Sequence, residues 1–486
     1  MNWPARIARL RFVAAIALCS CGQAPAAPSG ASSDAGADSE GGQSPEASAT
    51  VVASITVNQA VTAGKIPPGF VGLSYEKAHL TDGFFRASNA PLVGLLKLLG
   101  PSILRVGANT VDETTWTPAG PGGTDGQIAK PDVDAFAALV QAAGWTSIYA
   151  VNLKTSTAPM ASDEASYAAG ALGTSLYGFE IGNEPDLYTS TAVEPTWSYE
   201  SFKTEWESFA AAIRTAVPSA PLTGPAAASD YSDYTVPFAS DEAATIGLLT
   251  EHYYRDNSAS PTATVGELLS ADSLLADMLS TVAAAAKKNA IANGYRLDEA
   301  NSLYNGGKQG VSDTFASALW AIDLLFTNVR YGSSGVNFHG GNTPGWYTPI
   351  ADADGAVVEV RPIFYGMLLF ALAGSGNVLT TSVEASVALS AYAVAAADGS
   401  TRVVLANADS TATAHATVDL GKTGSAASVT RLTGPSLAAT TGITLAGATI
   451  TASGAWTPGP LPSIQVTGST LVIDVPPASV ALINAQ

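Results

Sequence analysis

The 486-residue sequence is poor in cysteine, in basic residues and in long hydrophobic runs. Lys and Arg number 22 against 41 Asp and Glu, which gives a formal net charge of −19 at pH 7. So acidic a chain repels a phosphate backbone, and nucleic acid is therefore not an expected partner. No apolar run after residue 20 approaches the roughly 20 residues that span a bilayer. The body of the chain is expected to be a soluble, Ala-rich globular protein.

Cysteine occurs only at Cys19 and Cys21, both beside an N-terminal leader. Arginines at positions 6, 9 and 11 precede the apolar run FVAAIAL, which is typical of a signal peptide over residues 1–20. The stretch LCSC at 18–21 resembles a bacterial lipobox, with Cys19 where Ala, Ser, Thr or Val is usual. We expect export, with Cys21 lipidated and the protein anchored in the outer membrane or periplasm by that lipid only, or otherwise secreted. The mature fold would then contain no disulfide.

Residues 21–52 are predicted to form a flexible, low-complexity tether. Positions 22–50 contain no aromatic residue and no Leu, Ile or Val. Such a segment cannot bury enough apolar surface to offset the entropy of ordering it.

Residues 67–375 alternate strand-like and helix-like segments. The strand candidates are 70–76, 102–109, 147–153, 177–184, 221–227, 246–254, 295–302 and 335–341. Eight such units predict an α/β fold, a parallel (β/α)8 TIM barrel whose buried strands read as apolar runs. A doubly wound open sheet is the alternative, but no Gly-x-Gly-x-x-Gly or Walker pattern follows the early strands.

The pattern changes after residue 375. Residues 376–486 are rich in Thr and Ser, alternate apolar with small polar residues, and lack helical periodicity. This predicts a C-terminal all-β sandwich domain. It contains almost no candidate catalytic carboxylates, so the chemistry is expected in the barrel.

Polar residues recur where the predicted barrel strands end, which is where such barrels carry their functional side chains. Glu184, in the stretch GFEIGNEPDLY, ends the fourth strand, and Glu299 ends the seventh. Two glutamates facing each other across the barrel mouth can approach to about 5–5.5 Å, the spacing of a retaining glycosidase. In that chemistry Glu184 would be the acid/base and Glu299 the nucleophile.

Four motifs in chain order, LRVGANTVD, FEIGNEPDLY, EHYY and DEANSLYNGG, together resemble glycoside hydrolase family 79, the β-glucuronidase and heparanase family. The resemblance covers residues 53–486. It implies that 53–66 is a strand segment joining the sandwich. It also implies an exported retaining β-glucuronidase that releases terminal glucuronic acid, or its 4-O-methyl form, from a glycan or glycoside.

The resemblance also implies roles for further residues. Asn183 would bind the sugar 2-hydroxyl, and Tyr254 would hold ionised Glu299. A tyrosine hydroxyl and the backbone N–H groups of a glycine pair would hold the sugar carboxylate. The complete set of proposed substrate-binding residues is Glu76, Asp112, Asn183, Tyr254, Tyr304, Gly306, Gly307 and Tyr347. The loop around "GAN" departs from the family, with Ala108 where relatives often have a second glycine.

No cofactor and no metal site are expected, because the four histidines show no close ligand spacing and the reaction needs no metal. Two alternatives keep the chemistry but change the substrate: a heparanase-like endo-β-glucuronidase, and a β-glucosidase or β-xylosidase. A third is of another class, a surface glycan-binding lipoprotein that has lost catalysis. Retention of both Glu184 and Glu299 argues against that third alternative.

Overall fold

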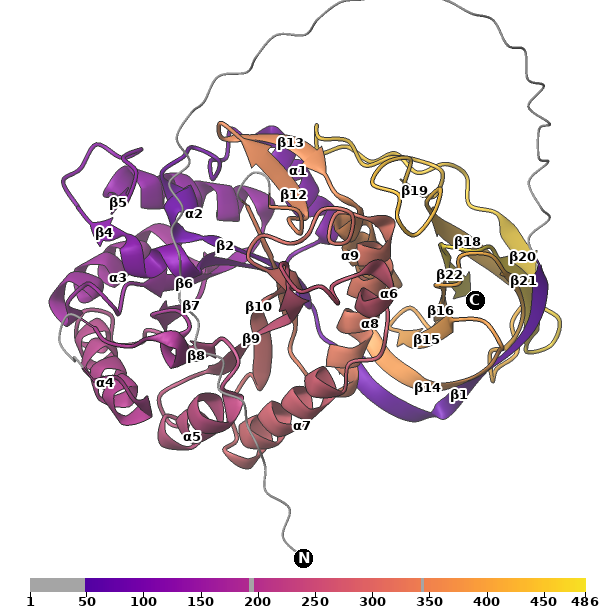
Figure 1. The fold of residues 1–486 in the computed structure, drawn as a ribbon, viewed down its shortest axis with the longest axis horizontal. Coiled ribbons are helices and arrows are strands. Elements are labelled where there is room, and N and C mark those ends of the chain that lie inside the picture. The colour runs from indigo at the N-terminus through magenta and orange to yellow at the C-terminus, as the bar shows by residue number, and fades with distance from the viewer. Residues whose placement is uncertain (1–48, 192–195, 342–344) are drawn as a thin grey trace, which may run out of the picture. The chain divides into compact units, whose positions relative to one another are not determined.

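The computed structural model describes residues 49–191, 196–341 and 345–486. The predicted signal peptide, most of the tether and Cys21 lie outside these residues. Residues 48–486 form one compact unit that contains the helix-covered barrel and a large β-sheet (Figure 1).

Eight parallel strands close into a barrel, which confirms the predicted fold class. In spatial order they are β2 (Val71–Glu76), β3 (Ile103–Gly107), β6 (Thr146–Val151), β7 (Leu176–Ile181), β8 (Leu222–Ala227), β9 (Leu248–Asn257), β10 (Tyr295–Tyr304) and β11 (Val336–Gly340). The apolar character of these strands follows from burial on both sides, as in other parallel barrels.

Helices follow each barrel strand and form the outer layer. They are α1 (Ala90–Leu99), α2 (Lys130–Ala143), α3 (Ala158–Leu172), α4 (Tyr199–Ala216), α5 (Val236–Asp241), α6 (Val265–Leu268) with α7 (Ser273–Lys288), α8 (Phe315–Arg330) and α9 (Pro362–Ala373). Side chains start several of them: Asp272 accepts hydrogen bonds from the N–H groups of Leu274 and Leu275 at the start of α7. The stretch Val265–Lys288 is long and apolar enough to cross a membrane by length and composition alone. Here α7 buries one apolar stripe, which includes Leu279 and Val282.

The remaining strands form one ten-stranded sheet, in the order β19-β18-β22-β16-β15-β14-β1-β17-β21, with β20 paired to β18. Their bounds are β1 (Thr50–Ile66), β14 (Gly376–Glu384), β15 (Leu389–Ala396), β16 (Thr401–Asn407), β17 (Thr413–Asp419), β18 (Ala426–Thr433), β19 (Thr444–Leu445), β20 (Ser463–Gln465), β21 (Thr470–Val475) and β22 (Ser479–Ala485). The N-terminal β1, indigo in Figure 1, lies between β14 and β17 and pairs with β17 in parallel. The sandwich is therefore one continuous sheet folded around its own core, which includes Ile55, Leu405 and Ile473.

Two short strand pairs were not expected from the sequence. The hairpin β12 (Ile350–Ala353) and β13 (Ala356–Val360) follows the last barrel strand, and β4 (Thr115–Trp116) pairs with β5 (Gln127–Ile128). Both lie in loops after barrel strands, which is the side that carries functional residues in this fold.

Candidate active site

The end of β7 places Glu184 at the mouth of the barrel. Gly182, with φ of 82°, turns the chain out of the strand, and Glu184 itself adopts a left-handed conformation with φ of 51°. Its N–H donates to the Ala226 carbonyl at 2.9 Å, which ties this turn to β8. A non-glycine residue in this region carries backbone strain, which clusters at functional sites. The Glu184 side chain remains 16% exposed, so it can meet a ligand.

Glu299 reaches the barrel interior through an irregularity in β10. The register of β10 shifts between Leu297 and Glu299 against β9, and between Leu297 and Ala300 against β11. Successive side chains of a regular strand point to opposite faces, whereas a bulge can aim two neighbours to the same side. Asp298 and Glu299 consequently both lie in the barrel, 0% and 3% exposed.

The two predicted catalytic glutamates lie close together. One carboxylate oxygen from each of Glu184 and Glu299, and one ring nitrogen of His252, all fall within 4.8 Å of one another. His252 Nδ1 lies 3.0 Å from Glu184 Oε1. The sequence did not single out His252 as more than a member of the EHYY motif.

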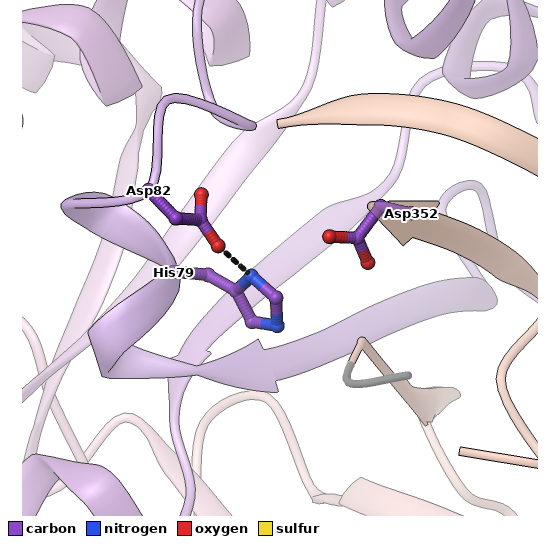
Figure 2. A group of neighbouring side chains, drawn as sticks. All are labelled: His79, Asp82 and Asp352. Carbon is purple, nitrogen blue, oxygen red and sulfur yellow. Dashed lines mark hydrogen bonds and ion pairs between the residues drawn. The ribbon is translucent and has the colours of Figure 1, made fainter. Parts of the chain in front are cut away.

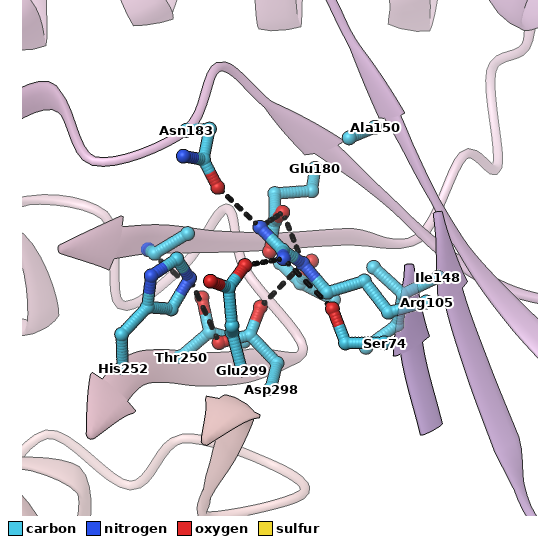
Figure 3. Close-up of polar contacts among 12 residues, drawn as sticks. Ser74, Arg105, Ile148, Ala150, Glu180, Asn183, Thr250, His252, Asp298 and Glu299 are labelled. Atoms are coloured by element: carbon cyan, nitrogen blue, oxygen red, sulfur yellow. Dashed lines mark hydrogen bonds and ion pairs between the residues drawn. The ribbon is translucent and has the colours of Figure 1, made fainter. Parts of the chain in front are cut away.

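A fully buried arginine organises the floor of this site (Figure 3). Arg105 donates to Glu180 Oε1 at 2.8 Å, to Glu299 Oε2 at 2.7 Å, to Asn183 Oδ1 at 2.8 Å and to Ser74 Oγ at 3.1 Å. The planar guanidinium holds several acceptors in fixed directions at once. Arg105 thereby fixes Glu299 and Asn183, from strand ends on two sides of the barrel, relative to each other.

Glu299 is held in its ionised form. Burial alone raises the pKa of the Glu299 carboxyl, but the charges of His339, His252 and Arg105 and the hydrogen bond from Tyr254 hold that pKa well below its ordinary value. The Tyr254 hydroxyl donates to Glu299 Oε1 at 2.7 Å. An ionised, hydrogen-bonded carboxylate beside a second, partly exposed carboxyl can act as a nucleophile with an adjacent acid/base.

The other two predicted carboxylates have different surroundings. Glu76 Oε2 accepts two hydrogen bonds from Thr110, while its Oε1 lies 3.9 Å from His339 Nε2 on the Glu299 side. Both oxygens of Asp112 are already used, by the backbone N–H groups of Leu153 and Lys154 and by the Tyr188 hydroxyl. Burial raises the pKa of Asp112 to about 6. In the structure Asp112 holds the loop after β6 rather than presenting a free oxygen to a sugar.

The three predicted tyrosines form an aromatic cluster. The Tyr254 ring centroid lies 6.3 Å from that of Tyr304 and 6.1 Å from that of Tyr347. The glycine pair is used in a way that the sequence did not predict: the Gly307 N–H donates to the Leu303 carbonyl, and the Gly306 carbonyl accepts from Trp346. The Gly307 N–H is therefore occupied, and the turn instead fixes the loop that carries Tyr347.

Sequence reasoning missed the buried acids Glu180 and Asp298. Glu180 reads as a single charge inside an apolar strand, and that isolation was its only signal. Asp298 was hidden by alternation, because a residue adjacent to an inward Glu299 is expected to face outward.

A second group of ionisable side chains lies on the loop after β2 and on β12 (Figure 2). One ligand atom each from His79, Asp82 and Asp352 lies within 4.8 Å of the others, and His79 Nδ1 pairs with Asp82 Oδ2 at 2.5 Å. Burial alone lowers the pKa of His79, but the hydrogen bond and charge of Asp82 and the charge of Asp352 raise it overall. His79 therefore pairs with Asp82 within the loop after β2, and Asp352 of the β12 hairpin lies beside this pair. The spacing of these residues in the sequence gave no sign of their proximity.

Comparisons with known proteins find one family model and two curated relatives. A family model described as the glycosyl hydrolase family 79 C-terminal beta domain matches residues 391–482. A β-glucuronidase of Neurospora crassa is 25% identical over 276 residues, which is 49% of this chain and 49% of that protein. A β-glucuronidase of Aspergillus niger is 29% identical over 178 residues, 31% of this chain and 32% of that protein. The alignments thus span about half, or less, of these relatives.

Solved structures share the fold over most of the chain. A 4-O-α-L-rhamnosyl-β-D-glucuronidase from Fusarium oxysporum 12S superposes with a TM-score of 0.73 at 19% identity, covering 88% of this chain and 99% of that one. A family 51 α-L-arabinofuranosidase from Bifidobacterium longum gives 0.68 at 18% identity, covering 90% and 100%. The C-terminal domain match and the two β-glucuronidase relatives make the chain similar to glycoside hydrolase family 79, and the solved structures show the shared fold.

Proposed function

We propose that this protein is a retaining β-glucuronidase that releases terminal β-linked glucuronic acid, or its 4-O-methyl form, from a glycan or glycoside. The observation that carries the proposal is the Glu184–Glu299 pair, of which one oxygen from each lies within 4.8 Å of the other, with Glu299 held ionised. That separation fits the approximately 5–5.5 Å of double displacement and leaves too little room for the water of an inverting enzyme. The β-glucuronidase relatives support the choice of sugar.

In the proposed mechanism, each step of the reaction belongs to a named group. The Glu299 carboxylate attacks the anomeric carbon while Glu184 protonates the leaving oxygen, which gives a glycosyl-enzyme ester. Glu184, now a base, then takes a proton from water, and that water displaces Glu299 with net retention. Arg105 holds the Asn183 carbonyl oxygen, and this leaves the amide nitrogen to donate to the sugar 2-hydroxyl.

One observation favours an alternative sugar specificity, that of a β-glucosidase or β-xylosidase. The occupied Gly307 N–H leaves Tyr304, Tyr347 and the Gly306 N–H as neutral donors for a sugar carboxylate. A neutral-sugar enzyme, a β-glucosidase or β-xylosidase, uses the same glutamates. Hydrolysis of a chromogenic aryl β-glucuronide beside the matching β-glucoside and β-xyloside decides between them. Strong preference for the glucuronide is expected, whereas preference for a neutral sugar would overturn the specificity but not the two glutamates.

The nucleophile assignment is tested by Glu299→Gln. We expect turnover of the aryl glucuronide to fall at least about 10³-fold, because the neutral amide cannot form the ester. Binding of glucuronic acid, followed by calorimetry, should persist. Undiminished turnover in this variant would rule out Glu299 as the nucleophile.

The acid/base assignment and retention need a separate measurement. Glu184→Ala should leave ester formation from an activated aryl glucuronide but slow ester hydrolysis, because no base activates water. Azide should restore aryl release and give the β-glucuronyl azide, and NMR of the first wild-type sugar product should show the β-anomer. A first product of α configuration would refute the retaining mechanism.

We also propose that the protein is exported and anchored to a membrane by a lipid on Cys21. The support is the basic and apolar leader and the LCSC stretch at 18–21. Labelled palmitate should enter the full-length protein in a bacterial host and should be lost in Cys21→Ser. Equal labelling of both proteins would refute the anchor.

A further inference from the structure

Three buried carboxyl oxygens below the catalytic glutamates have no hydrogen-bond donor among the described residues: Glu180 Oε2 and both oxygens of Asp298. Both side chains are fully buried, 0% exposed. Ionised carboxylates only accept hydrogen bonds, and leaving such acceptors unsatisfied in the interior costs free energy. The absence of donors for three neighbouring acidic oxygens indicates that a proton is needed here.

The charges around Arg105 indicate the same. Arg105 lies 2.6 Å from Glu180, 2.7 Å from Glu299 and 3.3 Å from Asp298. If all three acids were ionised, three negative charges would surround one guanidinium in a fully buried space. Two carboxyl groups that share a buried site cannot both ionise readily, so one keeps its proton.

We propose that Asp298 carries a proton and shares it with Glu180, so that this neutralised pair leaves the charge of Arg105 to the nucleophile Glu299. Asp298 is then a positioning residue that acts through Arg105 and does not touch the substrate. The functional part of this inference rests on the proposed function, whereas the protonation of Asp298 does not.

The geometry assigns the proton to Asp298 rather than to Glu180. Glu180 receives a direct hydrogen bond from Arg105 Nε at 2.8 Å and is therefore the ionised member. Burial and the adjacent Glu180 raise the pKa of Asp298 well above its ordinary value, against the lowering effect of Arg105. A protonated Asp298 has one O–H to donate, the Glu180 side chain lies within hydrogen-bonding reach of it, and Glu180 Oε2 is a buried acceptor without a donor among the described residues.

Charged and titratable groups from β9, β10 and β3 also face Asp298. From β9, His252 Nε2 lies 3.8 Å from Asp298 Oδ1, beyond hydrogen-bond distance. On β10, the charge of Glu299 raises the pKa of Asp298. The charges of Asp298 and Arg296 also attract each other. On β3, the charge of Arg105 lowers the pKa of Asp298. An ionised Asp298 would raise the pKa of Glu299, because a third negative charge would compete for Arg105.

Infrared difference spectroscopy tests the proton directly and needs no activity. The full-length wild type minus Asp298→Asn at pH 7 should show the carbonyl band of a protonated carboxylic acid. Glu251→Gln is the matched control: Glu251 is another fully buried acid whose pKa burial raises, with Thr235 as its donor. That variant should lose its own band and keep that of Asp298. Absence of an Asp298-dependent band would overturn the proposal.

Thermal unfolding against pH gives a second test. The folded pKa of Asp298 is raised, so its contribution to stability is full below about pH 4 and is lost as pH rises toward the folded pKa. Asp298→Asn lacks this loss, so the Tm of the variant should rise relative to the Tm of the wild type as the pH increases from 4 to 8. A Tm difference between the two proteins that stays constant over that range would mean that Asp298 is ionised throughout, and it would overturn the proposal.

Kinetics with the aryl glucuronide test the functional part. Glu180→Gln removes the charged partner of Arg105, and kcat/KM should fall about a hundredfold or more. Asp298→Ala removes the donor to Glu180, whereas Asp298→Asn restores a neutral donor and should recover most of the activity lost in Asp298→Ala. A larger loss in Asp298→Asn than in Glu180→Gln would place the proton on Glu180 and overturn the assignment. If the wild type does not cleave glucuronides, the proposed function fails while the infrared and unfolding tests still decide the protonation.

Discussion

Tyr254 and Arg105 stabilise the same carboxylate from different directions. Tyr254 binds Glu299 Oε1 and Arg105 binds Oε2, so each oxygen of the nucleophile has its own donor. Hydrogen bonds to the charged form of an acid favour that form. The folded pKa of Glu299 is depressed, so its contribution to stability is present above about pH 4.3 and is lost as pH falls through the folded pKa.

Tyr254→Phe should weaken the nucleophile without removing it. Loss of one donor raises the pKa of Glu299 toward its ordinary value, so the acid limb of the kcat/KM profile should move to higher pH. We expect kcat to fall about ten- to a hundredfold. The measurement is hydrolysis of the preferred aryl glycoside between pH 3 and 8.

Tyr304→Phe is the control for that variant, because the Tyr304 ring packs on Tyr254 without a hydrogen bond from Tyr304 to Glu299 among the described contacts. Its acid limb should stay in place, whatever happens to KM. An equal shift of the limb in both variants would show that the tyrosine cluster, and not the single hydrogen bond, sets the pKa.

At the scale of single elements, the turn after β10 contacts the loop after β11 that carries Tyr347, because the Trp346 N–H donates to the Gly306 carbonyl. Gly306 and Gly307 both have positive φ, 83° and 78°, which glycine adopts without strain. A Cβ on Gly307 would lie 2.7 Å from Tyr347 N and 3.0 Å from the Ser312 side chain, whereas a Cβ on Gly306 meets nothing within 4 Å.

Gly307→Ala and Gly306→Ala are therefore a matched pair. Gly306→Ala should cost only the left-handed strain, about 1 kcal/mol of unfolding free energy. Gly307→Ala should cost more and should also raise KM, because the loop that carries Tyr347 must move. Tm and the KM for the aryl glycoside measure both effects; equal costs for the two variants would mean that the turn tolerates displacement.

At the scale of the molecule, some sheet residues, such as Tyr392 and Val404, pack in the hydrophobic core of the barrel, while the sheet also has a core of its own. Phe326 of α8 stacks on Tyr392 of β15 at 4.2 Å between ring centroids, and the N–H groups of Phe315 and Ala316 donate to the carbonyls of Ala439 and Leu437. The apolar helix α9 packs in the same core. These contacts tie α8, which connects β10 to β11, to the sheet.

Phe326→Ala should destabilise barrel and sheet together. Truncation of a fully buried phenylalanine costs about 3–5 kcal/mol, which lowers the Tm of a chain of this length by about 4 °C. Leu274→Ala, at a side chain 77% exposed, is the control and should leave Tm nearly unchanged. Scanning calorimetry should show one transition that moves as a whole. Two transitions, with only one shifted, would mean that the two domains unfold independently.

Much of this molecule could be read from local sequence. The eight apolar segments predicted the barrel strands because parallel strands are buried on both sides, and the change to Ser- and Thr-rich alternation marked the sheet. Glu184 and Glu299 were found because charged residues at the ends of apolar strands fall on one rim of a barrel.

Long-range pairing and departures from regular geometry could not be read in this way. Alternation hid Asp298, because only the register shifts of β10 against β9 and β11 turn it to the same side as Glu299. The parallel pairing of β1 with β17 depends on contacts between residues far apart in the chain. The Gly307 N–H donates within a turn to Leu303, and no residue type in the sequence predicts this hydrogen bond. The sequence by itself determined which side chains are present and on which strand ends they stand, because hydrophobic periodicity is local. Only the tertiary structure decided which acids share Arg105 and which keeps a proton, because charge and burial depend on distances in space.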